Sequence, residues 1–259
     1  MENTTSIGMN RTGLEMAPMS KDDMVEFAIA KAPEAPLEEG EFEALHMEYI
    51  EEADGLGSVP IPGNLKGMAS TGMEKLKGNK PEVLIDKLGE RLAFERGGTR
   101  LYEALILKCS AIASQASTNG GSTASGIDVD KQDGAVVDLS MLERIRSEEE
   151  NHFQLVRRAL TTLGADPTAM TPCADVVGVS TMGLIQTVTD PSTTVPQCLN
   201  AVLTAELTDN AGWELLIELV ADAGHTEMAK EFSVALEEER IHLETIKNWL
   251  RTAVLAEAS

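Results

Sequence analysis

The sequence predicts an all-α protein, built as a four-helix bundle with a long crossover between the second and third helices and preceded by an N-terminal extension. Two observations support this fold class. Four long segments repeat apolar residues at steps of three and four, which is the period of a helix, and strand signals are scarce. A connection of about 30 residues separates the second segment from the third, which is typical of bundles with a crossover.

The chain is expected to divide into an extension over residues 1–80 and a helical part over residues 81–259. The extension begins with a stretch rich in Met and polar residues, and residues 34–54 then carry nine acids and no Lys or Arg. Within this acidic stretch a short helix is expected at residues 41–52. Gly, Pro and Lys are frequent in residues 55–80, which therefore indicate a loop.

The four helices of the bundle are expected at residues 81–114, 140–163, 194–224 and 226–256. Each has a signal near its start. Pro81 and Pro196 fall in first turns, where the missing N–H of proline costs no hydrogen bond. Ser140 opens a Ser-x-x-Glu capping box, and Thr226 can cap the last helix through its hydroxyl.

Two long connections join these helices. Residues 115–135 are rich in Ser, Thr and Gly and are expected to form a loop. Gly164 and Pro167 end the second helix and open the crossover. A short helix is expected within the crossover, near residues 176–188.

The composition restricts the partners and the compartment. Acids outnumber bases 43 to 21, so the formal net charge is −22. This charge argues against nucleic acid or an anionic membrane as a partner, because phosphates and lipid head groups repel it. No signal peptide and no apolar run of about 20 residues is evident. The three isolated cysteines, Cys109, Cys173 and Cys198, fit a reducing compartment, so a cytoplasmic protein is expected.

The apolar stripe of each bundle helix is interrupted near its middle by a glutamate, and two of these glutamates are followed by a histidine three residues later. The residues are Glu95, Glu149, His152, Glu206, Glu239 and His242. Four carboxylates that converge in a core are costly, because removing an ion from water without compensation costs several kcal/mol. Two divalent cations would cancel the four negative charges, and Glu-x-x-His places both side chains on one helix face. The sequence therefore predicts a dimetal carboxylate site.

A single Glu-x-x-His pair is weak support for such a site, since all four histidines of this acidic chain follow an acid by three residues. Glu43 and His46 lie in the extension, where no partner helices are expected. Asp222 and His225 flank the expected end of the third helix, where capping or solvation is the simpler interpretation. The remaining two pairs lie at the centres of long apolar stripes.

The two halves of the bundle repeat the same arrangement of ligands. Glu95 precedes Glu149 by 54 residues and Glu206 precedes Glu239 by 33, and the difference of 21 equals the length of the 115–135 loop. Each half thus contributes one glutamate helix followed by one Glu-x-x-His helix. A two-fold repeat of this kind favours a metal site over a chance arrangement.

This pattern resembles the ferritin-like superfamily, and within it the bacterioferritin and rubrerythrin branch, over about residues 81–256. The resemblance implies a ferritin-like four-helix bundle that holds two Fe ions, with Mn as the alternative metal. It also implies two terminal carboxylates, two bridging carboxylates and one imidazole per metal. In that order, the matching residues are Glu95 and Glu206, Glu149 and Glu239, and His152 and His242.

Four further residues are candidates for roles beside the metals. Tyr102 matches the tyrosine often found near such sites, where it has a catalytic role, and the alternative is a core aromatic. Asp209 lies three residues after Glu206, as an extra metal ligand does in some rubrerythrin-like proteins, and a hydrogen bond to a histidine is the alternative. Gly97 and Gly98 interrupt a helix interior and would allow either close packing or access to the metals, or mark a simple irregularity.

The resemblance implies a reaction with O2 or H2O2, and a ferroxidase or oxidase that takes Fe2+ is favoured. The alternatives are an iron-storage or metal-buffering homo-oligomer, or an oxygenase, peroxidase or catalase with iron or manganese. Three scattered cysteines cannot build the four-cysteine iron centre of rubrerythrin, so that electron route is not expected. The extension and the 115–135 loop enlarge the subunit, which argues against an ordinary 24-subunit cage.

Overall fold

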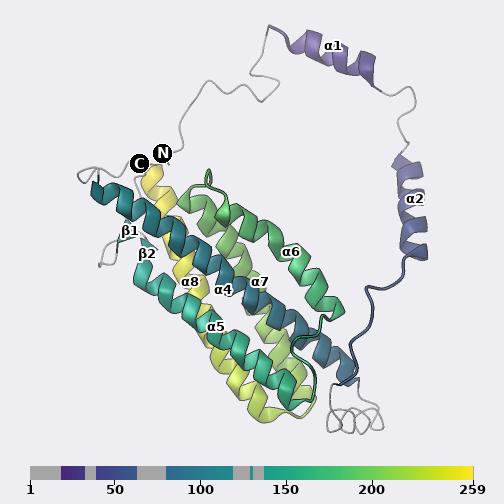
Figure 1. The fold of residues 1–259 in the computed structure, drawn as a ribbon. Coiled ribbons are helices and arrows are strands. Elements are labelled where there is room, and N and C mark those ends of the chain that lie inside the picture. Colours follow the sequence, from purple (N-terminus) through teal and green to yellow (C-terminus); the bar gives the residue numbers. More distant parts are fainter. Residues whose placement is uncertain (1–18, 33–38, 63–79, 119–128, 131–136, 259) are drawn as a thin grey trace. The chain divides into compact units, whose positions relative to one another are not determined.

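The computed structural model describes residues 19–32, 39–62, 80–118, 129–130 and 137–258 (Figure 1). These residues form seven helices and two strands of two residues each. The helices are α1 (Lys21–Lys31), α2 (Glu39–Glu52), α4 (Pro81–Thr118), α5 (Leu139–Thr162), α6 (Pro172–Thr189), α7 (Val195–Asp222) and α8 (Thr226–Glu257), and the strands are β1 (Val129–Asp130) and β2 (Val137–Asp138). The predicted all-α class is confirmed.

The chain divides by its internal contacts into two units. The smaller lies within Thr5–Leu56, and the larger includes everything from Gly57 to the C-terminal end. The predicted boundary at residue 80 adjoins residues 63–79, which lie outside the described part of the chain, and stays a prediction. No helix of the described ranges combines the length and the apolar character that crossing a bilayer requires.

The smaller unit contains α1 and α2. The helix predicted at residues 41–52 is confirmed as α2, which begins two residues earlier. Helix α1 was not predicted. Its first turn carries Asp22 and Asp23 and its last turn carries Lys31, which suits the dipole of a helix, and none of its residues is buried.

Four long helices of the larger unit, α4, α5, α7 and α8, lie side by side as a bundle (Figure 1). Helix α4 packs along α5, and α7 packs along α8. The crossover between α5 and α7 contains α6, which packs against α4 and α7. Since α6 runs back along the bundle, α5 and α7 begin at the same end, as Figure 1 shows. The short helix expected near residues 176–188 is therefore present and longer than predicted.

The helix ends differ in detail from the prediction. The start of α5 is capped by Asp138, whose carboxylate accepts hydrogen bonds from the backbone N–H of Ser140 (2.8 Å) and Met141 (3.3 Å), so the Ser140 capping box is wrong. The Thr226 cap is also wrong, because Thr226 is the first helical residue of α8 and His225 precedes it. At the start of α7, Thr194 forms a capping box that the sequence analysis did not name.

Helix α4 continues to residue 118, four residues beyond its expected end, into the stretch predicted as loop. Of the rest of that stretch, residues 119–128 and 131–135 lie outside the described part of the chain. The short parallel pairing of β1 with β2, in which Val129 lies opposite Val137, was not predicted. Val137 is fully buried and contributes to the bundle core.

The bundle core consists of two apolar clusters separated by a polar layer. One cluster includes Leu142 and Ile145 of α5 and the residues around Val202 of α7. The other takes Val156 of α5 and Trp213 of α7. Each of the four long helices contributes one segment to the first cluster and another segment to the second. The glutamate that interrupts the apolar stripe lies between these two segments. The fold thereby places the predicted ligands at one level in the middle of the bundle.

Candidate metal centre

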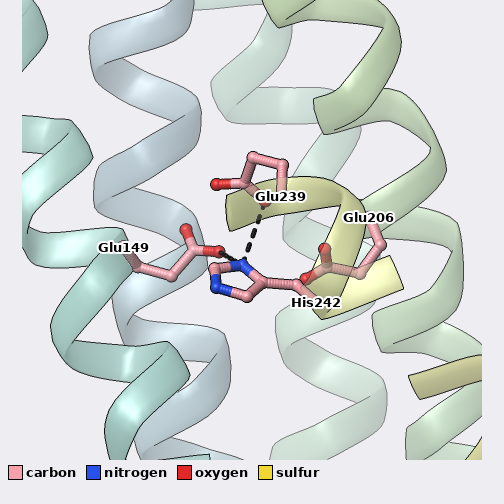
Figure 2. Close-up of side chains that lie close together, drawn as sticks. All are labelled: Glu149, Glu206, Glu239 and His242. Atoms are coloured by element: carbon pink, nitrogen blue, oxygen red, sulfur yellow. Dashed lines mark hydrogen bonds and ion pairs between the residues drawn. The ribbon is translucent and has the colours of Figure 1, made fainter. Parts of the chain in front are cut away.

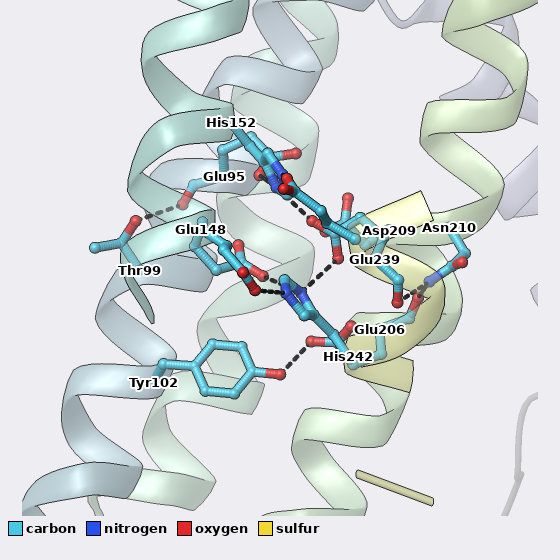
Figure 3. A network of polar contacts seen from close by, with 12 residues as sticks. Glu95, Thr99, Tyr102, Glu148, His152, Glu206, Asp209, Asn210, Glu239 and His242 are labelled. Carbon is cyan, nitrogen blue, oxygen red and sulfur yellow. Dashed lines mark hydrogen bonds and ion pairs between the residues drawn. The ribbon is translucent and has the colours of Figure 1, made fainter. Parts of the chain in front are cut away.

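The polar layer brings all six predicted ligands together, with Asp209 and Tyr102 beside them (Figures 2 and 3). The eight residues come from α4, α5, α7 and α8 and expose at most 2% of their surface. Three overlapping groups of ligand atoms each lie within 4.8 Å of one another. They are Glu149, Glu206, Glu239 and His242; then Glu95, His152 and Glu239; then Glu95, Glu149, Asp209 and Glu239. Buried Glu and His side chains in this arrangement could hold metal ions.

Glu239 is common to all three groups and lies between the two histidines. Its Oε1 is 2.6 Å from Nδ1 of His152, and its Oε2 is 3.1 Å from Nδ1 of His242 (Figure 3). One oxygen of Glu239 is thus directed to each imidazole. Glu149 belongs to two of the groups, and its Oε1 lies 3.6 Å from Nδ1 of His242.

The outer nitrogens of the two histidines contact acids on the opposite helix. Nε2 of His152 lies 2.8 Å from Oε2 of Glu238, and Nε2 of His242 lies 2.9 Å from Oε2 of Glu148. A carboxylate at this nitrogen fixes the ring orientation and turns Nδ1 toward the cluster. The sequence analysis missed both acids, although each directly precedes a Glu-x-x-His motif, so that the repeated unit is Glu-Glu-x-x-His.

Several buried polar atoms of the cluster have no hydrogen-bond partner. They are Oε2 of Glu95, Glu149 and Glu206, Oε1 of Glu239 and Nδ1 of His152. Most buried polar atoms are hydrogen-bonded, and leaving one unsatisfied costs about 1–3 kcal/mol. The close approach of His152 to Glu239 lacks the alignment of a hydrogen bond, so it does not satisfy either atom. Metal ions placed among these atoms would satisfy them together.

Without metals, protons compensate the buried charge. Burial, together with the charge of neighbouring carboxylates, raises the pKa of Glu95 and Glu206 well above the usual value and also raises the pKa of Glu149. Burial would lower the pKa of both histidines, but their carboxylate contacts outweigh it and raise the pKa to about 10 for His152 and about 12 for His242. Burial opposes ionisation of Glu239 as well, yet its histidine contacts lower its pKa to about 2.

Tyr102 of α4 reaches across the bundle and donates a hydrogen bond from its hydroxyl to Oε1 of Glu206 (Figure 3). Burial and the Glu206 charge raise the pKa of this phenol well above its usual value, so the hydroxyl keeps its proton. The other tyrosine of the chain, Tyr49, is exposed on α2. Tyr102 is therefore the phenol that contacts the cluster.

Asp209 forms a buried ion pair with Arg91 of α4, which the sequence analysis did not identify. The Nη1 atom of Arg91 also lies 3.4 Å from Oε1 of Glu95. The hydrogen bond from Asp209 to a histidine that was one alternative is not formed, since the histidines use Glu148, Glu238 and Glu239. Arg91 lies four residues before Glu95 on the same helix face, and the sequence pattern alone does not separate a buried arginine from an exposed one.

The two adjacent glycines of α4 differ in their surroundings. A Cβ atom added to Gly98 would lie 2.9 Å from Cδ of Glu149 and closer still to its Oε2, whereas one added to Gly97 would meet nothing within 4 Å. Gly98 therefore makes room for the Glu149 carboxylate. The structure gives no packing reason for Gly97.

Neither of the remaining histidines belongs to the ligand groups found among the described residues. His46 and Glu43 are exposed on α2, and His225 and Asp222 lie at the junction of α7 and α8. Gly224 in this junction adopts a φ of +84°, which favours glycine and ends α7. Comparison of the chain with models of protein families, with curated proteins and with solved structures found no match.

The glycine pair provides a matched test of the cluster geometry. Gly98→Ala should weaken Mn2+ binding by about tenfold or more, because the new methyl group displaces the Glu149 carboxylate. Gly97→Ala should leave Mn2+ binding unchanged and raise the free energy of unfolding by up to about 1 kcal/mol, since alanine is the better helix former. Calorimetric titration and chemical denaturation measure the two effects. Equal Mn2+ affinities in both variants would contradict the assigned role of Gly98.

The outer acids should matter although they lie outside the cluster. Replacing Glu148 and Glu238 together by Ala should lower the Mn2+ affinity by about 10–100-fold, because both imidazoles lose the contact that orients them. Glu150 and Glu237 serve as the control, since they are the exposed neighbours on the same helices and pair with arginines. Their replacement by Ala should change the affinity by less than about twofold. A similar loss in both pairs would indicate a general effect of surface charge.

The raised pKa values predict that metal-free protein loses stability as the pH increases. A group whose pKa is higher in the folded state stabilises the fold below its unfolded pKa, and this contribution is lost as the pH rises toward the folded pKa. For His152 and His242 the loss begins near pH 6.5 and continues toward 10 and 12. Thermal unfolding of chelator-treated protein should therefore show a falling Tm between pH 6.5 and 8.5.

The same experiment with saturating Mn2+ should show the opposite trend, because metal binding displaces the protons and strengthens as their concentration falls. Replacement of both histidines by Gln should flatten the metal-free profile. A Tm of the metal-free native protein that stays constant over this interval would contradict protonated histidines in the cluster.

Proposed function

We propose that this chain is a dimetal carboxylate protein of the ferritin-like type, and that its metals are iron. One ion would be held on the side of Glu95 and His152, and the other on the side of Glu206 and His242. Glu149 and Glu239 would be shared by both ions. The overlapping ligand groups support this division, because Glu239 occurs in each of them.

The main support for this proposal is that buried carboxylate oxygens without hydrogen-bond partners converge in one cluster. Each of the four glutamates has one oxygen without a hydrogen-bond partner, and all four residues are within the same cluster. A structural polar network would satisfy these atoms internally, because each unsatisfied atom weakens the fold. A cluster shaped to bind cations leaves them available for coordination.

The ferritin-like assignment is supported by the order of the helices. The crossover helix α6 allows α5 and α7 to begin at the same end of the bundle, and each half supplies a glutamate helix and a Glu-x-x-His helix (Figure 1). The ligand groups combine several carboxylates with imidazole and contain no thiolate, a donor set that suits iron and manganese. The acidic chain, with its net charge of −22, would also raise the local concentration of Fe2+.

A ferroxidase or oxidase reaction fits the residues around the cluster. Bound there, two Fe2+ ions would supply electrons to O2 or H2O2. Glu95 and Glu206 hold protons in the metal-free protein, as their raised pKa values indicate, and would release them when they become ligands. The apolar clusters above and below the polar layer would exclude water from the reacting groups. We assign Tyr102 as a hydrogen-bond donor that orients the Glu206 carboxyl, because its hydroxyl contacts Glu206 and keeps its proton.

Anaerobic titration with Fe2+ tests the proposal. The native protein should bind two ions per chain and then consume O2 or H2O2 with the formation of ferric iron, followed by absorbance and an oxygen electrode. Glu149→Ala and Glu239→Ala should each abolish binding of the pair, because each removes a shared ligand. Glu143→Ala, an exposed acid on α5, is the control and should bind both ions.

Unchanged iron content in the Glu149 and Glu239 variants would overturn the proposal. Uptake of many more than two ions per chain, in a hollow homo-oligomer visible by electron microscopy, would instead favour iron storage. Two bound Mn2+ ions with release of O2 from H2O2, and no reaction of the iron form, would favour a catalase.

A further inference from the structure

A buried arginine lies against the carboxylate cluster on the side of Glu95. Arg91 of α4 exposes 3% of its surface, pairs with Asp209 of α7, and places Nη1 at 3.4 Å from Oε1 of Glu95. A guanidinium group does not lose its proton in proteins, so this positive charge is permanent. The core therefore contains a fixed cation, Arg91, beside its acids.

The surroundings hold this guanidinium in place. Its Cζ lies 4.9 Å from the ring centre of Phe94 and 5.7 Å from that of Trp213. On α7, Gly212 faces it: a Cβ atom added there would lie 2.6 Å from the Cζ of Arg91 and closer still to Nη2. A glycine inside a helix costs about 1 kcal/mol relative to alanine, so α7 gives up stability at the position where the guanidinium is accommodated.

Asp209 has access to the cluster as a fifth carboxylate. One of its oxygens lies within 4.8 Å of ligand oxygens from Glu95, Glu149 and Glu239. The five acids carry a charge of −5 when ionised, and Arg91 reduces this to −4. Two divalent cations balance that charge, whereas five unpaired carboxylates would leave one negative charge in the core.

We infer that Arg91 is a built-in cation of the metal centre, which neutralises Asp209 and keeps it from becoming a metal ligand. This inference rests on the proposed function, since it requires that the cluster binds two divalent ions. Arg91 is a positioning residue: it acts on the metals through the charge and orientation of Asp209. The ion pair of Arg91 with Asp209 and the longer contact with Glu95 leave Glu95 available for coordination.

A double-mutant cycle at Arg91 and Asp209 tests the inference with Mn2+ affinity and the visible spectrum of bound Co2+. Arg91→Gln should raise the Mn2+ affinity by at least about tenfold, because the cluster gains one net negative charge at short range. The Co2+ absorption should weaken, since Asp209 raises the coordination number. Asp209→Asn should lower the Mn2+ affinity by at least about tenfold, because the Arg91 charge is then uncompensated, and should leave the Co2+ spectrum unchanged.

The double variant decides between the roles of Asp209. Its charge equals that of the native cluster, so Arg91→Gln with Asp209→Asn should restore the Mn2+ affinity to within about threefold and restore the native Co2+ spectrum. If the double variant stays as weak as Asp209→Asn alone, Asp209 is itself a ligand and the inference is wrong. An Arg91→Gln protein with native affinity and spectrum would also overturn it, because Arg91 would then only fill space.

Two measurements keep the test decisive where a variant is unstable. Should Arg91→Gln fail to fold, the Co2+ spectrum of Asp209→Asn alone tests whether Asp209 is a ligand, since loss of a ligand changes that spectrum. Arg91→Lys keeps the charge and should bind Mn2+ with native stoichiometry. If the native protein does not bind two Mn2+ or Co2+ ions, the proposed function itself is wrong. This outcome is distinguished from failure of the Arg91 inference because it is measured on the native protein before any variants are compared.

Discussion

The mutual repulsion and desolvation of four glutamates in the middle of the bundle is the constraint on which the rest of the structure depends. Glu95, Glu149, Glu206 and Glu239 expose at most 2% of their surface, so water cannot compensate their charge. In the metal-free protein the compensation comes from protons on the histidines and on the carboxyl groups with raised pKa values. On the proposed function, metal binding would replace these protons and would be coupled both to pH and to the stability of the bundle.

The apolar clusters and the helix contacts hold the acids at one level despite this repulsion. Each long helix contributes to the core above and below the polar layer, so no single helix can move away without opening both clusters. Asn210 adds a direct tie between α7 and α8, because its side-chain amide donates to the backbone carbonyls of Glu206 (3.0 Å) and Glu239 (3.2 Å). The backbones that carry Glu206 and Glu239 are thus linked, which would limit the reorganisation on ion binding under the proposed function.

The sequence predicted the four long helices and the six central residues because both follow from helical periodicity, which is a local property. Contacts between side chains on different helices do not follow from this periodicity. Arg91 and Asp209 are 118 residues apart, and the contacts of His152 with Glu238 and of His242 with Glu148 span 86 and 94 residues. The Ser140 cap was mistaken because Asp138, two residues earlier, is also a good cap residue and α5 begins directly after it. The unpredicted α1 has no buried face, so its pattern offers no core period to detect.

The repeat of ligands between the two halves does not extend to their neighbours. The position four residues before a terminal glutamate is Arg91 in one half and Val202 in the other, and the position three residues after it is Gly98 or Asp209. Glu206 receives a hydrogen bond from the Tyr102 phenol, whereas Glu95 lies beside a guanidinium group. The phenol keeps its proton and is neutral, whereas the guanidinium carries a permanent positive charge. On the proposed function, the two metal positions are therefore chemically different, because one adjoins a neutral hydrogen-bond donor and the other adjoins a fixed positive charge.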